Sequence, residues 1–119
     1  MTRAQRNRNP GNLKFAKQKG AVGKDNAGFA IFQTHIHGWR ALIAQVRLDA
    51  SRGLTIKQFI NKYAPPSEND SQAYCSFVCN GLKASPEASL ADYHPAAVAG
   101  LVAWYEGYFK EIKDASTPK

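Results

Sequence analysis

Carboxyl and amide side chains are the groups of this sequence best suited to chemistry. The 119 residues contain no P-loop, no dinucleotide-binding glycine pattern, no nucleophile elbow and no zinc-ligand spacing. Nine aspartates and glutamates remain as candidate acids and bases, and three of them stand out: Glu106, Glu68 and Asp25. Carboxyl groups can donate and accept protons in general acid–base catalysis, and this chemistry needs no cofactor. We therefore expect no cofactor.

Glu106 is the strongest candidate for proton transfer. It lies roughly 80° from the centre of the apolar stripe of the last predicted helix, at the margin of that stripe. Its neighbours include Trp104, Tyr105 and Tyr108. A carboxyl against apolar and aromatic surface holds its proton more readily, which suits it to act as an acid. The alternative is an exposed glutamate paired with Lys110 four residues on.

Residues 63–74, called the elbow below, form a polar segment with a tyrosine at each end. Pro65 and Pro66 fix φ and remove two N–H donors, which predicts a stiff, non-helical connection between two helices. Tyr63 ends one apolar-periodic segment and Tyr74 begins the next. Stiff polar loops on a helical frame often carry binding sites, although a plain connector is the alternative.

The other polar residues have structural alternatives as well. Glu68 could hold a water or a sugar hydroxyl, or cap a helix. Asn69, Asp70 or Ser71 can each cap the helix after the elbow. Asp25 follows a glycine-rich stretch, where a carboxylate commonly stabilises a turn.

Cys75 and Cys79 are four residues apart on one predicted helix. Helical geometry disfavours a disulfide at this spacing, so we predict two reduced, buried thiols. A metal site is not expected, because His35, His37 and His94 lie in other segments without ligand spacing.

Four helices and one hairpin must position these groups. Leu13 and Phe15 form one short alternating strand, and residues 29–32 form the other, with either Phe29 and Ile31 or Ala30 and Phe32 facing the core. Capping residues, glycines and apolar periodicity predict three helices: from Thr34 to Gly53, from Thr55 (with Gln58) to the elbow, and from the elbow to Leu82. A fourth helix begins at Pro95. Its predicted buried stripe consists of Val98, Leu101, Val102, Tyr105, Phe109 and Ile112.

Length and charge set the broad class. The chain predicts one domain over 9–114, a mobile basic start at 1–8 and a frayed tail at 115–119. No apolar run reaches membrane-spanning length, and no secretory signal is seen.

The formal net charge is +7, and no acid precedes Asp25. A polyanion partner, either nucleic acid or the bacterial envelope, would explain this charge, as would a solvated basic face. Residues 1–14 hold no aromatic residue, which disfavours nucleic acid.

Several short motifs occur in an order that resembles small lysozyme-like phage proteins opening with an Asn-Pro-Gly-Asn turn. The motifs are residues 7–13, 20–25, 28–32, 38–42, 52–56 and the elbow. These phage proteins are similar to the virion-associated lytic enzyme of lipid-containing phages. The resemblance covers about residues 6–107, nearly the whole chain.

The order is also similar to bacterial N-acetylglucosaminidases and lytic transglycosylases, in which a helix-ending glutamate precedes an asparagine-rich turn and a hairpin. Here that glutamate is absent from the start of the chain. Relatives tend to carry one near the end, in a helix closing His-Glu-Asn-Gly, and residues 104–107 read Trp-Tyr-Glu-Gly. Tyr105 therefore stands at the histidine position, and the asparagine is missing. The resemblance implies a circular permutation with Glu106 on the last helix.

The resemblance implies a mainly α fold with a small β-hairpin, lysozyme-like (α+β) and circularly permuted. The implied function is cleavage of the murein glycan strand by a muramidase, lytic transglycosylase or glucosaminidase reaction. Glu106 would be the catalytic acid and base, Tyr74 would face solvent and hold the reacting sugar, and Asn12, Tyr63, Glu68 and Asn69 would line the groove.

The implied partners are bacterial peptidoglycan and other virion proteins. The implied location is the virion or the periplasm of the infected bacterium. Two alternatives remain: a non-catalytic virion or cell-wall-binding protein with the same fold, and a basic nucleic-acid-binding phage protein.

Overall fold

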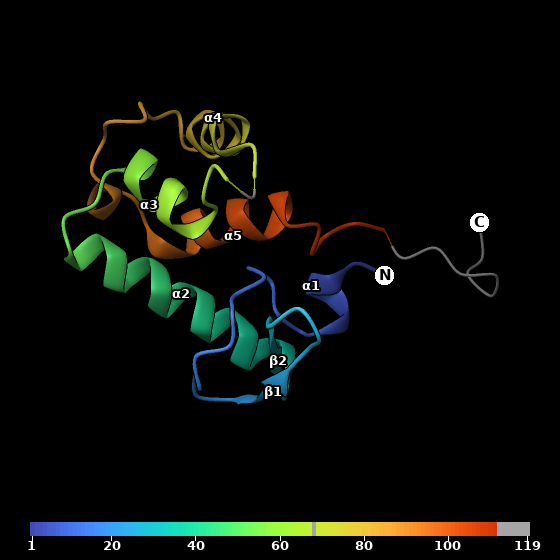
Figure 1. The fold of residues 1–119 in the computed structure, drawn as a ribbon. Coiled ribbons are helices and arrows are strands. Elements are labelled where there is room, and N and C mark those ends of the chain that lie inside the picture. Colours follow the sequence, from blue (N-terminus) through green and yellow to red (C-terminus); the bar gives the residue numbers. More distant parts are fainter. Residues whose placement is uncertain (68, 112–119) are drawn as a thin grey trace.

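The structure, a computed structural model, describes residues 1–67 and 69–111 and is mainly helical with one small antiparallel sheet (Figure 1). This architecture confirms the coarse fold expected from the sequence. Along the chain, the elements are α1 (Arg3–Arg6), β1 (Ala21–Lys24), β2 (Ala30–Phe32), α2 (His35–Ser51), α3 (Ile56–Tyr63), α4 (Ser71–Leu82), a 3₁₀ turn η1 (Leu90–Asp92) and α5 (Pro95–Tyr105).

Helices α2, α3 and α4 begin at predicted capping residues, and α5 begins at the predicted proline. The Thr34 hydroxyl accepts from the backbone N–H of His37, and Thr55 forms a reciprocal capping box at α3. Asp70, one of three candidates, caps α4 by accepting from Ala73. Pro95 occupies the first turn of α5. These starts depend on local side-chain-to-backbone bonds, which is why sequence alone located them.

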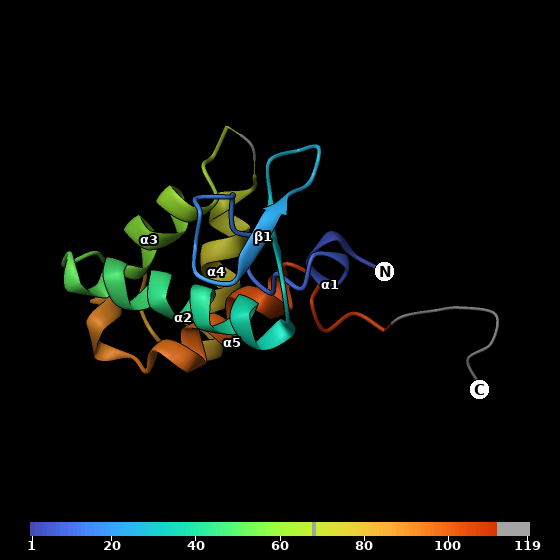
Figure 2. The ribbon, with the colours of Figure 1, turned by 90° about the horizontal axis from the view of Figure 1, so that it is seen from below.

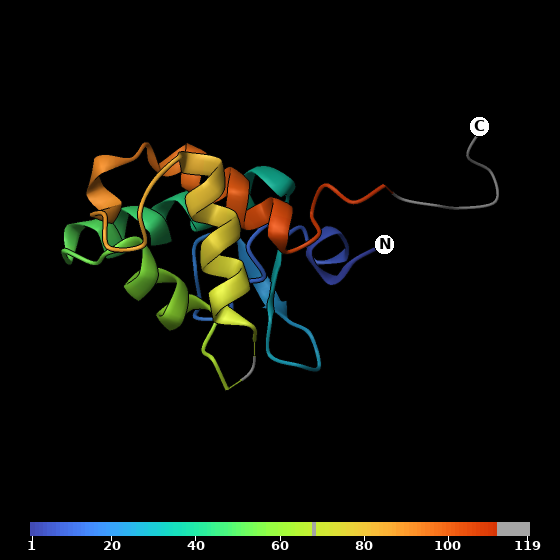
Figure 3. The ribbon, with the colours of Figure 1, turned by 90° about the horizontal axis from the view of Figure 1, so that it is seen from above.

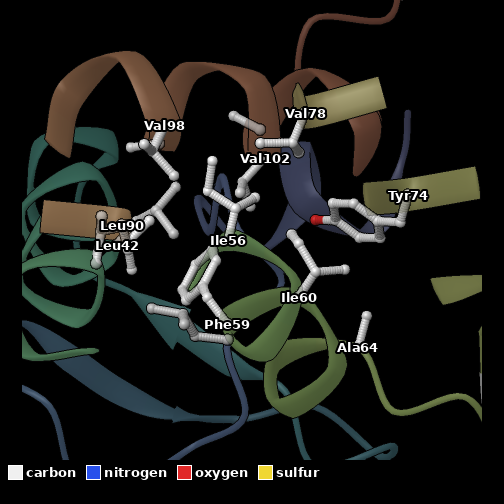
Figure 4. Close-up of a cluster of buried hydrophobic side chains, with 14 of the residues drawn as sticks. Leu42, Ile56, Phe59, Ile60, Ala64, Tyr74, Val78, Leu90, Val98 and Val102 are labelled. Atoms are coloured by element: carbon white, nitrogen blue, oxygen red, sulfur yellow. The ribbon is translucent and has the colours of Figure 1, made fainter. Parts of the chain in front are cut away.

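The core forms among α2, α3, α4 and α5. Helix α5 packs on α2 and α4, while α3 packs on α4. Figure 4 shows the apolar side chains of these helices and of η1 facing one another, with Ile56 near the centre of the cluster. The labelled core residues are Leu42, Ile56, Phe59, Ile60, Ala64, Tyr74, Val78, Leu90, Val98 and Val102.

The hairpin differs from the expected one in its first strand. Residues 21–24 pair with β2, and Ala21 lies opposite Phe32. The stretch around Leu13 and Phe15 contributes only an isolated bridge between Lys14 and Phe29. The chain turns away after this bridge through positive φ at Lys17 and Gly20, so the next segment reaches β2 instead. Ala30 and Phe32 are the buried pair, which confirms one of the two predicted alternatives.

Helix α5 ends at Tyr105, well before the predicted stripe runs out. Gly107 adopts φ of +85°, its N–H bonds the carbonyl of Trp104, and the N–H of Tyr108 bonds the carbonyl of Ala103. This is the Schellman arrangement that terminates helices at glycine. The prediction that Tyr105 and Phe109 lie on the buried stripe of this helix was therefore wrong, because they are 40% and 50% exposed. Ile112 lies outside the described residues.

Residues 1–8, for which a mobile basic start was expected, include the helix α1. Thr2 and Gln5 form a capping box around α1, and Ala4 is fully buried. The Thr2 hydroxyl donates to the carbonyl of Gly107 at 3.0 Å, and the Gln5 amide donates to that of Tyr108 at 3.1 Å. Contacts with the distant end of the chain thus order the start. The expected frayed tail lies outside the described residues.

The elbow joins α3 to α4 as predicted, with Pro65 and Pro66 in the non-helical turn. Its turn and the loop between β1 and β2 project from the same side of the molecule (Figures 2 and 3). None of the helices in the described ranges is long and apolar enough to cross a membrane.

Candidate active site

The carboxylate of Glu106 is held by two side chains from distant parts of the sequence. Its Oε1 accepts a 2.8 Å hydrogen bond from Nδ2 of Asn12, and its Oε2 accepts a 2.7 Å bond from the Tyr74 hydroxyl. Glu106 is also the C-cap of α5, so the helix end fixes its backbone. The structure therefore places Glu106 between the asparagine turn and the end of the elbow, and not in a pair with Lys110.

A turn organised by Asn9 presents Asn12 to Glu106. Asn9 is fully buried; its Nδ2 donates to the carbonyls of Leu13 and Ala30, and its Oδ1 accepts from the N–H of Leu13, each at 2.9 Å. Asn12 itself has φ of +49°, a conformation that asparagine tolerates better than most residues. Sequence reasoning identified the turn but overlooked Asn9 as the residue that holds it together.

Tyr74 reaches Glu106 from inside the protein. Its side chain is only 1% exposed, so the expectation that it faces solvent was wrong. Its four-residue spacing to Val78 puts both on the buried face of α4, and its ring stacks on Tyr105 at 4.0 Å between centroids. Burial, followed by the Glu106 charge, raises the pKa of Tyr74 far above its ordinary value. Tyr74 is therefore a permanent donor to Glu106.

Tyr63 holds the Asn12 turn against α3. Its hydroxyl donates to the carbonyl of Gly11. A Cβ at Gly11 would lie 2.3 Å from that hydroxyl and 2.6 Å from Leu42, so the close approach requires glycine. Burial, with the Glu106 charge as a second cause, raises the pKa of Tyr63.

A pocket of about 620 Å³ brings most of the predicted site residues together. Asn12, Tyr63, Asn69 and Glu106 all line it. Tyr74 is not among the lining residues and supports Glu106 from behind, while Glu68 lies outside the described residues. The pocket is completed by Arg3, Leu13, Lys14, Ala16, Gln18, Phe29, Gln45, Asp49, Lys62 and Ala64.

Asp49 is a second acid at this pocket that sequence reasoning missed. Its side chain is 1% exposed and bonds Lys62 Nζ at 2.6 Å, the Gln45 amide at 3.0 Å and Arg52 at 3.4 Å. The available signal was its position seven residues after Leu42, on the apolar stripe of α2, where an acid needs a partner. Lys62 neutralises the charge of Asp49. Asp49 therefore holds the side chains of Lys62, Arg52 and Gln45 in place at the pocket.

Asp25 has a structural role. Asp25 Oδ1 accepts from the N–H groups of Ala27 and Phe29, and Oδ2 accepts from the Asn7 amide at 2.9 Å. The Asn7 bond, with these backbone bonds and Arg3, lowers the pKa of Asp25. This confirms the turn-stabilising alternative for Asp25.

Cys75 and Cys79 are buried and unbridged, as predicted, with 3.9 Å between their sulfurs. Burial and the neighbouring Cys75 raise the pKa of Cys79 to about 11. Across residues 1–67 and 69–111, no three His, Cys, Asp or Glu side chains gather as a metal-binding group.

Comparison with known proteins gives the chain a family. No family profile matches it. Protein P5 of Pseudoalteromonas phage PM2 is 32% identical to it over 109 residues, which cover 84% of this chain and 68% of P5. The chain belongs to the P5 family. This membership confirms the expected phage context, since P5 is a bacteriophage protein. In this P5-family chain, the pocket around Glu106 is the candidate site.

Proposed function

We propose that this P5-family protein cleaves the glycan strand of bacterial peptidoglycan, with Glu106 as the general acid and base. One observation carries the proposal: two side-chain donors aim the Glu106 carboxylate at a pocket lined by amides and a tyrosine. A general acid must be held within hydrogen-bond reach of the oxygen it protonates. The bonds from Asn12 and Tyr74 provide that fixed orientation.

The proposed reaction uses a single carboxyl group. Glu106 donates a proton to the glycosidic oxygen as the bond to the anomeric carbon breaks. The carboxylate left behind keeps its two hydrogen bonds, which stabilise the negative charge. The oxygen of a water or of a sugar hydroxyl then bonds to the anomeric carbon and gives its proton to the Glu106 carboxylate, which leaves a hydrolysed or an anhydro product. Asp49 is engaged by Lys62 and Arg52, so the substrate's own groups serve in place of a second carboxylate.

The lysozyme-like assignment is part of this proposal. Glu106 ends a helix, and the Asn12 turn and the β1–β2 hairpin, which lie at the other end of the chain, are built onto the same side as its carboxylate. A fold whose chain order is glutamate, turn and hairpin would give this arrangement after circular permutation. The net charge of +7 favours binding to anionic murein, from within a virion or in the periplasm.

Digestion of purified murein tests the proposal. Wild type should release fragments whose new ends identify the bond cut, and anhydro ends would indicate a transglycosylase. Glu106→Gln should remain folded and lose about 100-fold or more of the rate, because the amide cannot donate and recover a proton. Glu111→Gln makes the same charge change five residues away and should keep the rate. Equal rates for Glu106→Gln and wild type would overturn the assignment. Murein binding without cleavage by wild type would instead indicate a wall-binding protein.

A further inference from the structure

A second pocket, of about 350 Å³, lies along α2 beside the one that holds Glu106. Its aliphatic lining comes from Ala41, Ala44 and Leu48. Two cationic side chains, Lys19 and Arg40, also line it. Both are exposed, and no acid is among the described lining residues. An aliphatic surface beside cations suits a ligand that carries both small apolar groups and carboxylates.

The two pockets are neighbours, because Gln18 and Gln45 line both of them. Each glutamine is held in place. The Gln45 amide donates to Asp49 at 3.0 Å, and the Gln18 amide donates to the carbonyl of Lys14 at 2.8 Å. The boundary that the two pockets share is therefore ordered.

The loop that carries Lys19 is anchored to α2 by close packing. A Cβ on Gly20 would lie 2.3 Å from the His37 ring, so only glycine lets this loop approach the helix. His37 is itself held by a 2.7 Å bond between its Nδ1 and the Thr34 hydroxyl. The loop bearing Lys19 is thus held against α2, the helix that carries Arg40.

We propose that this second pocket binds the acidic stem peptide of murein while the sugar chain lies in the pocket of Glu106. The inference rests on the proposed function, because the stem peptide is attached to the strand that is cleaved. Murein stem peptides combine alanine methyl groups with free carboxylates. The methyl groups match the Ala41, Ala44 and Leu48 surface, and the carboxylates match Lys19 and Arg40.

The test compares soluble murein strands that carry stem peptides with the same strands after an amidase has removed the peptides. Binding is measured in the Glu106→Gln background so that no strand is cleaved. The parent should bind the peptide-bearing strand about tenfold more tightly, equivalent to about 1.4 kcal/mol. Arg40→Gln and Lys19→Gln should each remove most of this preference and leave the affinity for stripped strands unchanged. Ala44→Leu should do the same by filling the pocket without changing charge.

Lys24→Gln is the matched control. Lys24 is an exposed lysine on β1 that lines neither pocket, and its substitution removes the same charge. If Lys24→Gln and Arg40→Gln lost the preference for peptide-bearing strands equally, general charge attraction would explain the preference, and the inference would be overturned. Equal binding of both strands by the parent would also overturn it, as would Arg40-dependent displacement by a single-stranded oligonucleotide. Cleavage by wild type without peptide preference would refute this inference alone, whereas peptide preference without cleavage would refute the enzymatic proposal.

Discussion

The hydroxyl of Tyr74, a core residue of α4, donates a 2.7 Å hydrogen bond to Oε2 of Glu106 at the end of α5. The donor is buried and the acceptor borders the pocket. Two helices that pack together in the core thus set the position of the carboxylate. The precision of the candidate site therefore depends on how well α4 and α5 pack.

Tyr74→Phe should lower both activity and stability. It removes a donor from a partly buried carboxylate, and hydrogen bonds to charged groups contribute about 1.5–3 kcal/mol. We expect a chemical-denaturation free energy lower by about 2 kcal/mol and a murein-cleavage rate lower by about tenfold or more. Tyr93→Phe, at a half-buried tyrosine that does not line the pocket, is the comparison variant. A Tyr74→Phe protein as stable as wild type would show that the bond contributes nothing.

Asn9→Ala should be among the most destabilising substitutions in the loops of this protein. The change removes three hydrogen bonds to backbone groups of Leu13 and Ala30, although the carbonyl of Leu13 keeps the N–H of Ala30 as a second donor. Each unsatisfied buried group costs about 1–3 kcal/mol, so we expect a loss of about 3 kcal/mol or more in urea unfolding. Asn69→Ala removes an exposed amide whose 3.4 Å bond is weak, and should cost less than about 0.5 kcal/mol. Similar losses in the two variants would refute the role given to Asn9.

Asp25 should make stability depend on acid pH. Its pKa is lowered in the native state, so its bonds to Asn7 and the loop backbone stabilise the fold fully above its ordinary value of 3.8. That contribution is lost as pH falls from 3.8 through the lower native pKa. Asp25→Asn should therefore be less stable than wild type near pH 6, and the difference should shrink below 3.8. Unfolding curves measured at several pH values would test this, and a difference that grows on acidification would contradict it.

The two cysteines should be inert in the native protein. The thiolate is the reactive form, and with a pKa of about 11 Cys79 is almost entirely protonated at pH 8. Both side chains are also buried, at 6% and 4% exposure. A thiol reagent should label Cys79 about 100-fold more slowly than in urea, because about one thiol in a thousand is ionised at pH 8 in the native protein, against about one in ten at the ordinary pKa of 9.0. The intact mass should match two free thiols, and a mass lower by two hydrogens would contradict the structure.

Local signals in the sequence determined the helix starts and the leading candidate residue. Thr34, Thr55 and Pro95 act through bonds or backbone limits within one turn of the chain, so their effect is readable without the fold. Glu106 was recognisable as an acid beside aromatics near a helix end. The cysteine spacing likewise excluded a disulfide on local geometry alone.

Only the tertiary structure decided what surrounds Glu106. Its two donors are 94 and 32 residues away, and no local pattern specifies such pairings. The contact of α1 with Gly107 and the burial of Asp49 beneath Lys62 arose in the same way, from packing between distant segments. Sequence periodicity reports which face of an element is apolar, but the partner of that face is chosen by the whole core. That is why a charge-rich start became an ordered helix and a tyrosine expected in solvent became the buried donor to Glu106.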